Sequence, residues 1–150
     1  MGKSGSLDSI IGDDIENINP VAVYYFTKGF IKERENLRVG KVGKFKVGKI
    51  KIEKVLGYLG YGEELIMQFK NNGSLIKKML ISMNINYKRY ENLGREFAKK
   101  YFSYNYAEIF DIGPERVAEL IGRCIYSKSY YFLFRENPPK NKIGRMPLHY

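Results

Sequence analysis

Two stretches of the chain consist almost entirely of apolar residues that favour β-strands. Residues 21–31, VAVYYFTKGFI, are mostly β-branched or aromatic, which is typical of strands. Residues 129–135 form a second aromatic run, followed by a polar, proline-containing segment. Short apolar runs bounded by polar residues indicate buried strands. We therefore predict strands near 21–31 and 129–135.

Residues 43–55 alternate apolar and polar positions with the period of two that a strand requires. The phase changes once, because Val47 and Ile50 fall on opposite parities with Gly48 between them. A glycine inside such a pattern indicates a bulge or a tight turn. We predict a strand near 43–55 with a row of lysines along its polar face.

The segment from residue 64 to residue 85 has two interpretations. As a hairpin, it places strands near 64–70 and 75–85 around Asn72-Gly73, a dipeptide that supplies the positive φ angles of tight turns. As a helix, residues 74–85 begin at a Ser74 cap and form a helix-turn-helix layout with the next element. The apolar stripe of that helix would be Leu75, Ile76, Met79, Leu80 and Met83. The Asn-Gly pair and the alternation of apolar residues favour the hairpin.

Two later segments carry the three-and-four spacing of amphipathic helices. In the first, about 88–102, the spaced apolar positions are Tyr90, Leu93, Phe97 and Tyr101. The second, about 114–126, opens with Pro114, which suits the first position of a helix. Together with the strands, these helices predict a single α+β domain built mainly on an antiparallel sheet.

Composition divides the chain into three parts. Residues 1–20 form an acidic leader, residues 21–136 the basic α+β domain, and residues 137–150 a proline-containing tail. We expect the leader and the tail to be mobile. Alternatively, the leader folds back on the basic domain and competes with its ligand. The apolar runs are too short to span a membrane and the first residues lack a secretory signal, so we expect a cytoplasmic protein without a membrane span.

The charge of the chain is the strongest indication of its function. The chain of 150 residues carries 26 Lys and Arg against 16 Asp and Glu, a formal net charge of +10. The leader contributes −3 and the rest of the chain +13, so the domain is more basic than the total suggests. A field of this strength attracts nucleic acid and other polyanions. One cysteine and one histidine exclude a disulfide framework within the chain, a multi-cysteine zinc site and most catalytic triads.

The densest basic segment and its neighbours predict a nucleic-acid-binding surface. Lysines on the polar face of the predicted strand would contact phosphates, which positions the ligand without reading its sequence. Tyrosines in the following glycine-rich loop would stack on unpaired bases. The predicted binding residues are Arg38, Lys41, Lys44, Lys46, Lys49, Lys51, Lys54, Tyr58, Tyr61, Lys88 and Arg89. The ligand is DNA or RNA, and we expect no cofactor.

Two other functions stay open. The first is a structural or interaction subunit of a larger assembly, which would dock through exposed aromatic residues, the leader and the tail. The second is a metal-dependent nuclease, whose Mg²⁺ ligands would be Asp8, Asp13, Asp14 and Glu16. Glu63 with Glu64, and Glu115 with Glu119, are further carboxylate candidates.

The single cysteine and histidine carry no catalytic prediction. Cys124 falls on the apolar face of the helix predicted over 114–126, where a packed and inert thiol is expected. His149 lies in the tail. We therefore expect a binding protein rather than an enzyme, with no bound metal.

Overall fold

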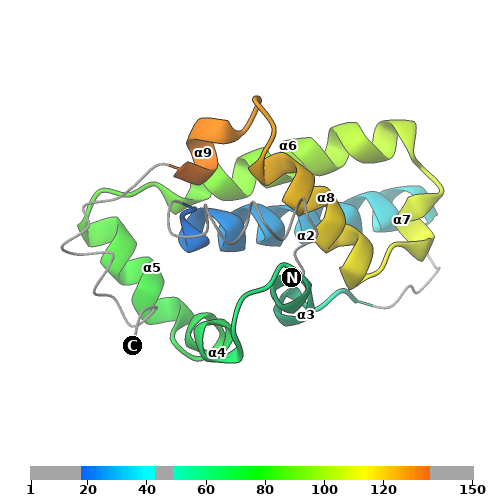
Figure 1. The fold of residues 1–150 in the computed structure, drawn as a ribbon. Coiled ribbons are helices and arrows are strands. Elements are labelled where there is room, and N and C mark those ends of the chain that lie inside the picture. The colour runs from blue at the N-terminus through cyan, green and yellow to red at the C-terminus, as the bar shows by residue number, and fades with distance from the viewer. Residues whose placement is uncertain (1–17, 43–48, 136–150) are drawn as a thin grey trace.

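The computed structural model describes the backbone of residues 18–42 and 49–135, and their side chains except those of 38–42. Every regular element in this part of the chain is an α-helix, so the predicted α+β fold with an antiparallel sheet is wrong. In chain order the helices are α2 (Pro20–Val42), α3 (Ile52–Tyr58), α4 (Glu63–Asn71), α5 (Gly73–Ser82), α6 (Tyr87–Tyr104), α7 (Glu108–Asp111), α8 (Pro114–Ile125) and α9 (Tyr131–Arg135). Figure 1 shows α2 in the middle of the molecule, with the other helices arranged around it.

The predicted strand at 21–31 is wrong, because these residues form the first half of the central helix α2. The three consecutive residues 21–23 are each 0% exposed, although successive side chains of a helix point about 100° apart. A helix that is enclosed on all sides shows no amphipathic period, so its apolar run reads like that of a buried strand. Farther along α2 the buried Arg34 donates a hydrogen bond from Nε to the carbonyl oxygen of Ile109, 2.9 Å away.

Helices α2 and α6 run side by side in the same direction and touch backbone to backbone (Figure 1). A methyl group added at Gly29 would overlap the carbonyl oxygen of Glu91, and one added at Gly94 would overlap that of Phe26. The contact is reciprocal. Gly29 faces Glu91, three positions before Gly94, and Gly94 faces Phe26, three positions before Gly29. Only glycine allows two helices to approach so closely. At the edge of this contact, Lys32 Nζ pairs with Glu91 Oε2 at 3.0 Å.

Aromatic side chains from other parts of the chain pack against those of α2. Phe26 packs edge-on against Tyr130 and Phe134, with ring centroids 5.2 and 5.1 Å apart. Tyr24 stacks almost flat on Phe69 of α4, with centroids 4.2 Å apart. Such edge-on and stacked ring pairs add to the stabilisation that burial provides. The core is therefore an aromatic one, centred on α2.

Three more predicted strands are wrong, because the described residues of each segment contain helix and no strand. The strand predicted near 43–55 ends within α3, and its first six residues lie outside the described part of the chain. The strand predicted at 64–70 is α4, in which Ile66 and Phe69 are buried at helical spacing. The strand predicted at 129–135 contains α9. The apolar runs at 64–70 and 129–135 are short enough to fit either kind of element, whereas the alternating pattern of 43–55 overlaps helix α3 from Ile52 onward.

The strand predicted over 75–85 is also wrong, and the helical alternative for this segment is confirmed. Helix α5 buries Ile76 and Leu80, which lie one turn apart. Its N-cap residue is Asn72 rather than Ser74, and the Asn72 side chain makes no capping hydrogen bond. The Asn-Gly pair therefore joins two helices and does not form the turn of a hairpin.

The two predicted amphipathic helices are confirmed as α6 and α8. Pro114 occupies the start of α8, as expected. Between α5 and α6, Asn84 adopts a φ of 62°, and the Ile85 amide donates to the carbonyl oxygen of Leu80 at 2.9 Å. This closing pattern ends α5 and lets the chain turn into α6. The predicted boundaries of leader, domain and tail stay predictions, because residues 1–17 and 136–150 lie outside the described residues.

Candidate anion-binding site

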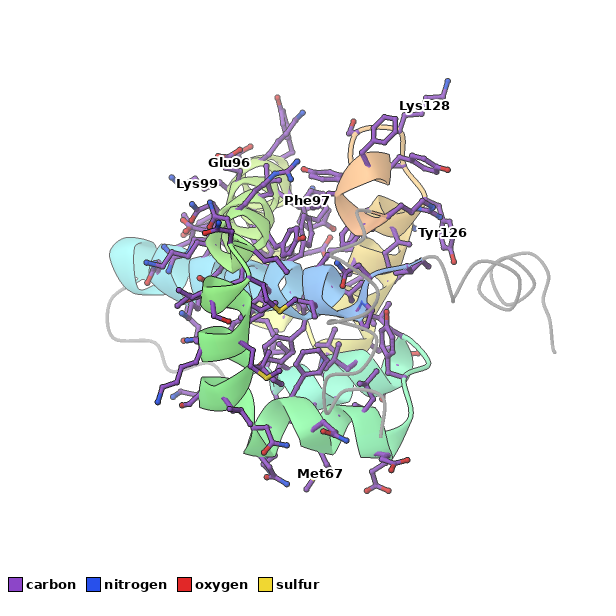
Figure 2. The ribbon with its side chains drawn as sticks, turned by 90° about the vertical axis from the view of Figure 1, so that its left-hand side faces the viewer. Met67, Glu96, Phe97, Lys99, Tyr126 and Lys128 are labelled. Carbon is purple, nitrogen blue, oxygen red and sulfur yellow. The ribbon has the colours of Figure 1, made fainter. Side chains whose placement is uncertain are left out.

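An open pocket of about 490 Å³ lies where α2, α4 and α5 meet. Figure 2 faces this side of the molecule, with α5 in front of α2 and α4 below it. The lining is polar and cationic: Lys28, Lys70, Asn71, Asn72, Gly73, Ser74, Leu75 and Lys77. We call it the lysine pocket. Three lysines and no carboxylate among its lining residues suit it to an anion.

The lysine pocket takes its shape from the sharp junction of α4 and α5. A single residue, Asn72, separates the two helices, and its amide donates to the carbonyl oxygen of Gln68 at 2.9 Å. Lys70 therefore lies in the last turn of α4 and Lys77 in α5, on either side of the bend. Lys28 comes from the central helix α2. The junction places Lys70 and Lys77 in the same pocket as Lys28 of α2, so lysines from three helices line one pocket.

Two of these lysines make cation–π contacts with tyrosine rings. Lys28 Nζ lies 5.9 Å from the ring centroids of both Tyr24 and Tyr25. Lys77 Nζ lies 5.6 Å from the ring centroid of Tyr87, and the rings of Tyr25 and Tyr87 are 4.9 Å apart. Each cation–π contact at this range is worth about 0.5–1 kcal/mol. The rings favour positions in which the two ammonium groups stay near each other.

The two ammonium groups also repel each other. The pKa of Lys28 is lowered, first by its burial and then by the positive charges of Lys77 and Lys32. Glu91 acts in the opposite direction, but its carboxylate is already engaged by Lys32 at 3.0 Å. An anion bound between Lys28 and Lys77 would relieve this repulsion.

The start of α5 adds neutral donors to the same lining. Gly73 and Ser74 belong to its first turn, and no side chain caps the helix at Asn72. Backbone amides at a helix start point outward and carry a partial positive charge. They supplement the lysines, whose convergence is the main feature of the site.

The structure places the sequence-predicted lysines differently from the expected strand. Lys49 and Lys51 are exposed just before α3, and Lys54 is exposed within it. They do not form a row on a strand, because residues 52–58 are helical. Lys88 and Arg89 are exposed at the start of α6, directly after Tyr87, whose ring lies beside Lys77.

The remaining predicted binding residues divide into described and undescribed ones. Tyr58 is 58% exposed at the end of α3. Tyr61 is half-buried, and burial raises the pKa of its hydroxyl, so its ring packs into the protein. The other four predicted side chains, those of Arg38, Lys41, Lys44 and Lys46, lie outside the described side chains.

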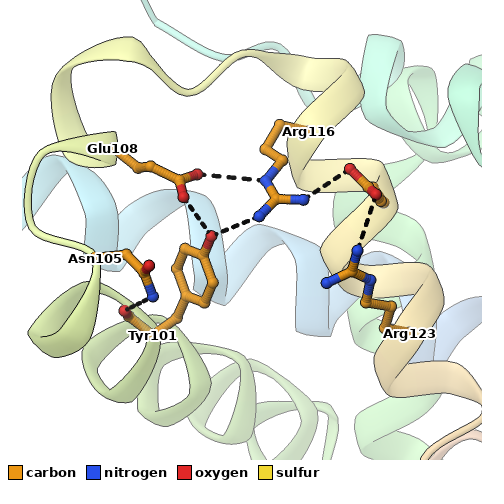
Figure 3. Close-up of polar contacts among 6 residues, drawn as sticks. Tyr101, Asn105, Glu108, Arg116 and Arg123 are labelled. Atoms are coloured by element: carbon orange, nitrogen blue, oxygen red, sulfur yellow. Dashed lines mark hydrogen bonds and ion pairs between the residues drawn. The ribbon is translucent and has the colours of Figure 1, made fainter.

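Carboxylates in the described part of the chain do not gather for metal binding. No group of three His, Cys, Asp or Glu side chains there could hold a metal ion. Glu119 instead accepts hydrogen bonds from Arg116 at 2.8 Å and Arg123 at 3.0 Å (Figure 3). The nuclease ligands predicted in the leader, Asp8 to Glu16, lie outside the described residues.

Cys124 is a buried free thiol, as predicted. Burial raises its pKa to about 12, so the nucleophilic thiolate is not formed near neutral pH. His149 lies outside the described residues.

Sequence reasoning missed the lysines of the pocket as binding residues. Lys28, Lys70 and Lys77 are separated in the sequence and carry no motif. Lys77 interrupts the otherwise apolar alternating positions of the strand predicted over 75–85. In helix α5 it simply lies off the buried stripe of Ile76 and Leu80, so the interruption argued against the strand and did not indicate a binding site.

None of the helices in the described part of the chain is both long and apolar enough to cross a membrane. Comparisons with protein-family models, with curated proteins and with solved structures find no match for this chain. The site is therefore interpreted from its own chemistry.

Proposed function

We propose that this protein binds nucleic acid through its phosphates, with the lysine pocket at the centre of the binding surface. The observation that carries the proposal is the convergence of Lys28, Lys70 and Lys77, from three helices, on one lining without a carboxylate. The positive charge of Lys77 already acts on Lys28, and like charges near each other are unfavourable unless an anion lies among them. A phosphate group supplies that anion.

The surroundings of the pocket support a polyanion rather than a small ion alone. Lys78 on α5 and Lys88 with Arg89 on α6 are exposed, and the whole chain has a formal net charge of +10. Contacts from lysine to phosphate hold a nucleic acid without reading its bases. The proposed binding is therefore largely independent of sequence, to DNA or RNA, and the proposed location is the cytoplasm.

A second candidate function, an interaction subunit, is favoured by one surface. Tyr131 and Phe132 on α9 are 46% and 76% exposed, and their rings touch edge-on with centroids 5.3 Å apart. Exposed aromatic pairs of this kind are typical of protein contact surfaces. The partner of such a surface would be another protein chain.

The test is fluorescence anisotropy with labelled single- and double-stranded DNA and RNA at rising salt. We expect micromolar or tighter binding that weakens steeply with salt. Changing Lys28, Lys70 and Lys77 together to Gln should lower the affinity more than about tenfold. The slope of affinity against salt should flatten by about one unit for each phosphate that the variant no longer neutralises.

A charge-matched variant provides the control. Lys49 and Lys51 precede α3 and Lys54 lies within it, and none of the three lines the pocket, so changing them together to Gln removes the same charge from another part of the surface. We expect this control to weaken binding far less than the pocket variant does. An equal loss of affinity in both would show that the pocket is not the centre. Circular dichroism of both variants checks that the helices are intact.

A further inference from the structure

We propose that the lysine pocket takes a terminal phosphomonoester, such as the phosphorylated end of a nucleic acid strand or the phosphate of a nucleotide, in preference to an internal phosphodiester. The inference rests on the proposed function, because it specifies which phosphate enters the pocket. The carrying observation is the placement of Lys28 and Lys77, with Lys70, in a single lining of about 490 Å³.

The charge of the pocket favours a terminal phosphomonoester. An internal phosphodiester carries one negative charge, whereas a terminal phosphomonoester carries about −1.5 to −2 at neutral pH and presents three acceptor oxygens. The pocket offers three ammonium groups, and burial followed by the positive charge of Lys77 already lowers the pKa of Lys28. A doubly charged group stabilises the protonated forms of both lysines better than a singly charged one. Three oxygens also allow each lysine its own acceptor.

The depth at which Lys28 lies also favours a terminal phosphate. Lys28 is half-buried on the central helix α2, while Lys70 is exposed on α4. In the view of Figure 2, α5 stands in front of α2. An internal phosphodiester is bonded to a sugar on each side. Its two free oxygens therefore stay close to the sugar-phosphate backbone of the nucleic acid and cannot reach deep into a pocket. A terminal phosphate hangs from a single ester bond and can extend inward to Lys28.

The size of the pocket is consistent with a nucleotide end. A volume of about 490 Å³ falls within the range of sites for small molecules and exceeds what one phosphate group fills. The first turn of α5, from Gly73, adds amide donors, and Leu75 adds an apolar surface that is 49% exposed. The pocket therefore has room for the sugar attached to the phosphate.

The experiment uses the full chain and one short oligonucleotide, labelled at an internal base, in three forms. The forms carry a 5′-phosphate, a 3′-phosphate, or hydroxyl groups at both ends. We expect at least one phosphorylated form to bind about tenfold more tightly than the hydroxyl form in fluorescence anisotropy, equivalent to about 1.4 kcal/mol. Unlabelled adenosine monophosphate should compete with that form more effectively than adenosine does.

Single variants link the preference to the pocket. Lys77→Gln should abolish the difference between the phosphorylated and hydroxyl forms, while Lys78→Gln, its exposed neighbour on α5, should keep it. Lys70→Gln is a second pocket variant at an exposed position, where a change does not disturb the core.

The outcomes separate the two proposals. Equal affinity for all three forms, with binding abolished when the pocket lysines are changed together, overturns the phosphomonoester preference and leaves nucleic-acid binding in place. A preference that survives Lys77→Gln and Lys70→Gln places the terminal phosphate elsewhere and also overturns it. Binding of adenosine monophosphate without any oligonucleotide supports the preference and overturns the proposed function. Binding of neither ligand overturns both.

Discussion

Gly29 and Gly94 are the positions at which a single methyl group should matter most. Each lies against a backbone carbonyl of the partner helix, and backbone cannot move aside as a flexible side chain can. We predict that Gly29→Ala or Gly94→Ala lowers the free energy of unfolding by about 2 kcal/mol or more, because α2 and α6 must separate. Urea unfolding followed by circular dichroism measures the change.

Gly57→Ala is the matched control for this prediction. A methyl group added at Gly57, within α3, meets nothing within 4 Å. Alanine favours a helix over glycine by about 0.5–1 kcal/mol, so this change should leave stability unchanged or raise it. If Gly29→Ala were as well tolerated as Gly57→Ala, the close contact of α2 with α6 would be incorrect.

At the scale of the elements, a polar network joins the end of α6 to α7 and α8 (Figure 3). Tyr101 donates to Glu108 at 2.7 Å and accepts from Arg116 at 2.9 Å. We predict that Tyr101→Phe lowers the free energy of unfolding by about 1 kcal/mol, because both partners lose a hydrogen bond. Chemical denaturation of the variant and the parent measures the difference.

Arg123→Gln provides the comparison for this network. Its ion pair with Glu119 lies within one turn of α8, and the Arg123 side chain is 66% exposed. Exposed pairs of this kind contribute little to stability. We therefore expect the unfolding midpoint of this variant to match that of the parent. A destabilisation as large as that of Tyr101→Phe would mean that the network acts through surface charge rather than through its hydrogen bonds.

The sequence predicted correctly the amphipathic helices, which expose one polar face to solvent. It did not predict the helices that lack such a face. Helix α6 exposes Lys99 and buries Ala98 and Phe102, so the helical period is visible. The first half of helix α2, residues 21–31, is buried on nearly all sides, and its β-branched and aromatic residues favour strands when the sequence is considered locally. In α5 the helical stripe and the alternating pattern share residues such as Met79 and Met83. Only tertiary packing decides between them.

The lysine pocket could not be predicted from the sequence for a different reason. Its lysines come from three helices, and no local pattern encodes that three such helices converge. The overall basic charge was visible in composition, which is why a polyanion ligand could be inferred without its site. Lys88 and Arg89, predicted from the exposed face of α6, follow Tyr87, which contacts Lys77 of the pocket.

On the scale of the whole molecule, buried hydroxyl and thiol groups make the fold sensitive to alkali. Burial raises the pKa of Tyr25 and Tyr61, and that of Cys124 to about 12. In the unfolded chain these groups ionise near pH 10 for tyrosine and pH 8.5 for cysteine. Since the folded pKa values are higher, the contribution of these groups to stability is complete below the unfolded values and is lost as the pH rises toward the folded ones.

We predict a free energy of unfolding that falls steadily above about pH 9. Urea titrations at increasing pH, with tyrosinate absorbance recorded in parallel, measure it. Tyr61→Phe removes one ionising group and should make the fall shallower, whereas Tyr58→Phe, at an exposed site, should leave it unchanged. A stability that is flat up to about pH 11 would contradict this account.

The central position of α2 has a consequence for how the chain is made. Phe30 is buried partly by α6 and Phe26 partly by Phe134 of α9, so the ribosome produces the apolar helix long before its coverings. At about 5–20 residues per second, roughly 5–20 s of synthesis separate α2 from α9. Once residues 21–31 have left the ribosome, their aromatic side chains lack these coverings until α6 and then α9 have been made, and until then they are accessible to a chaperone or a neighbouring nascent chain.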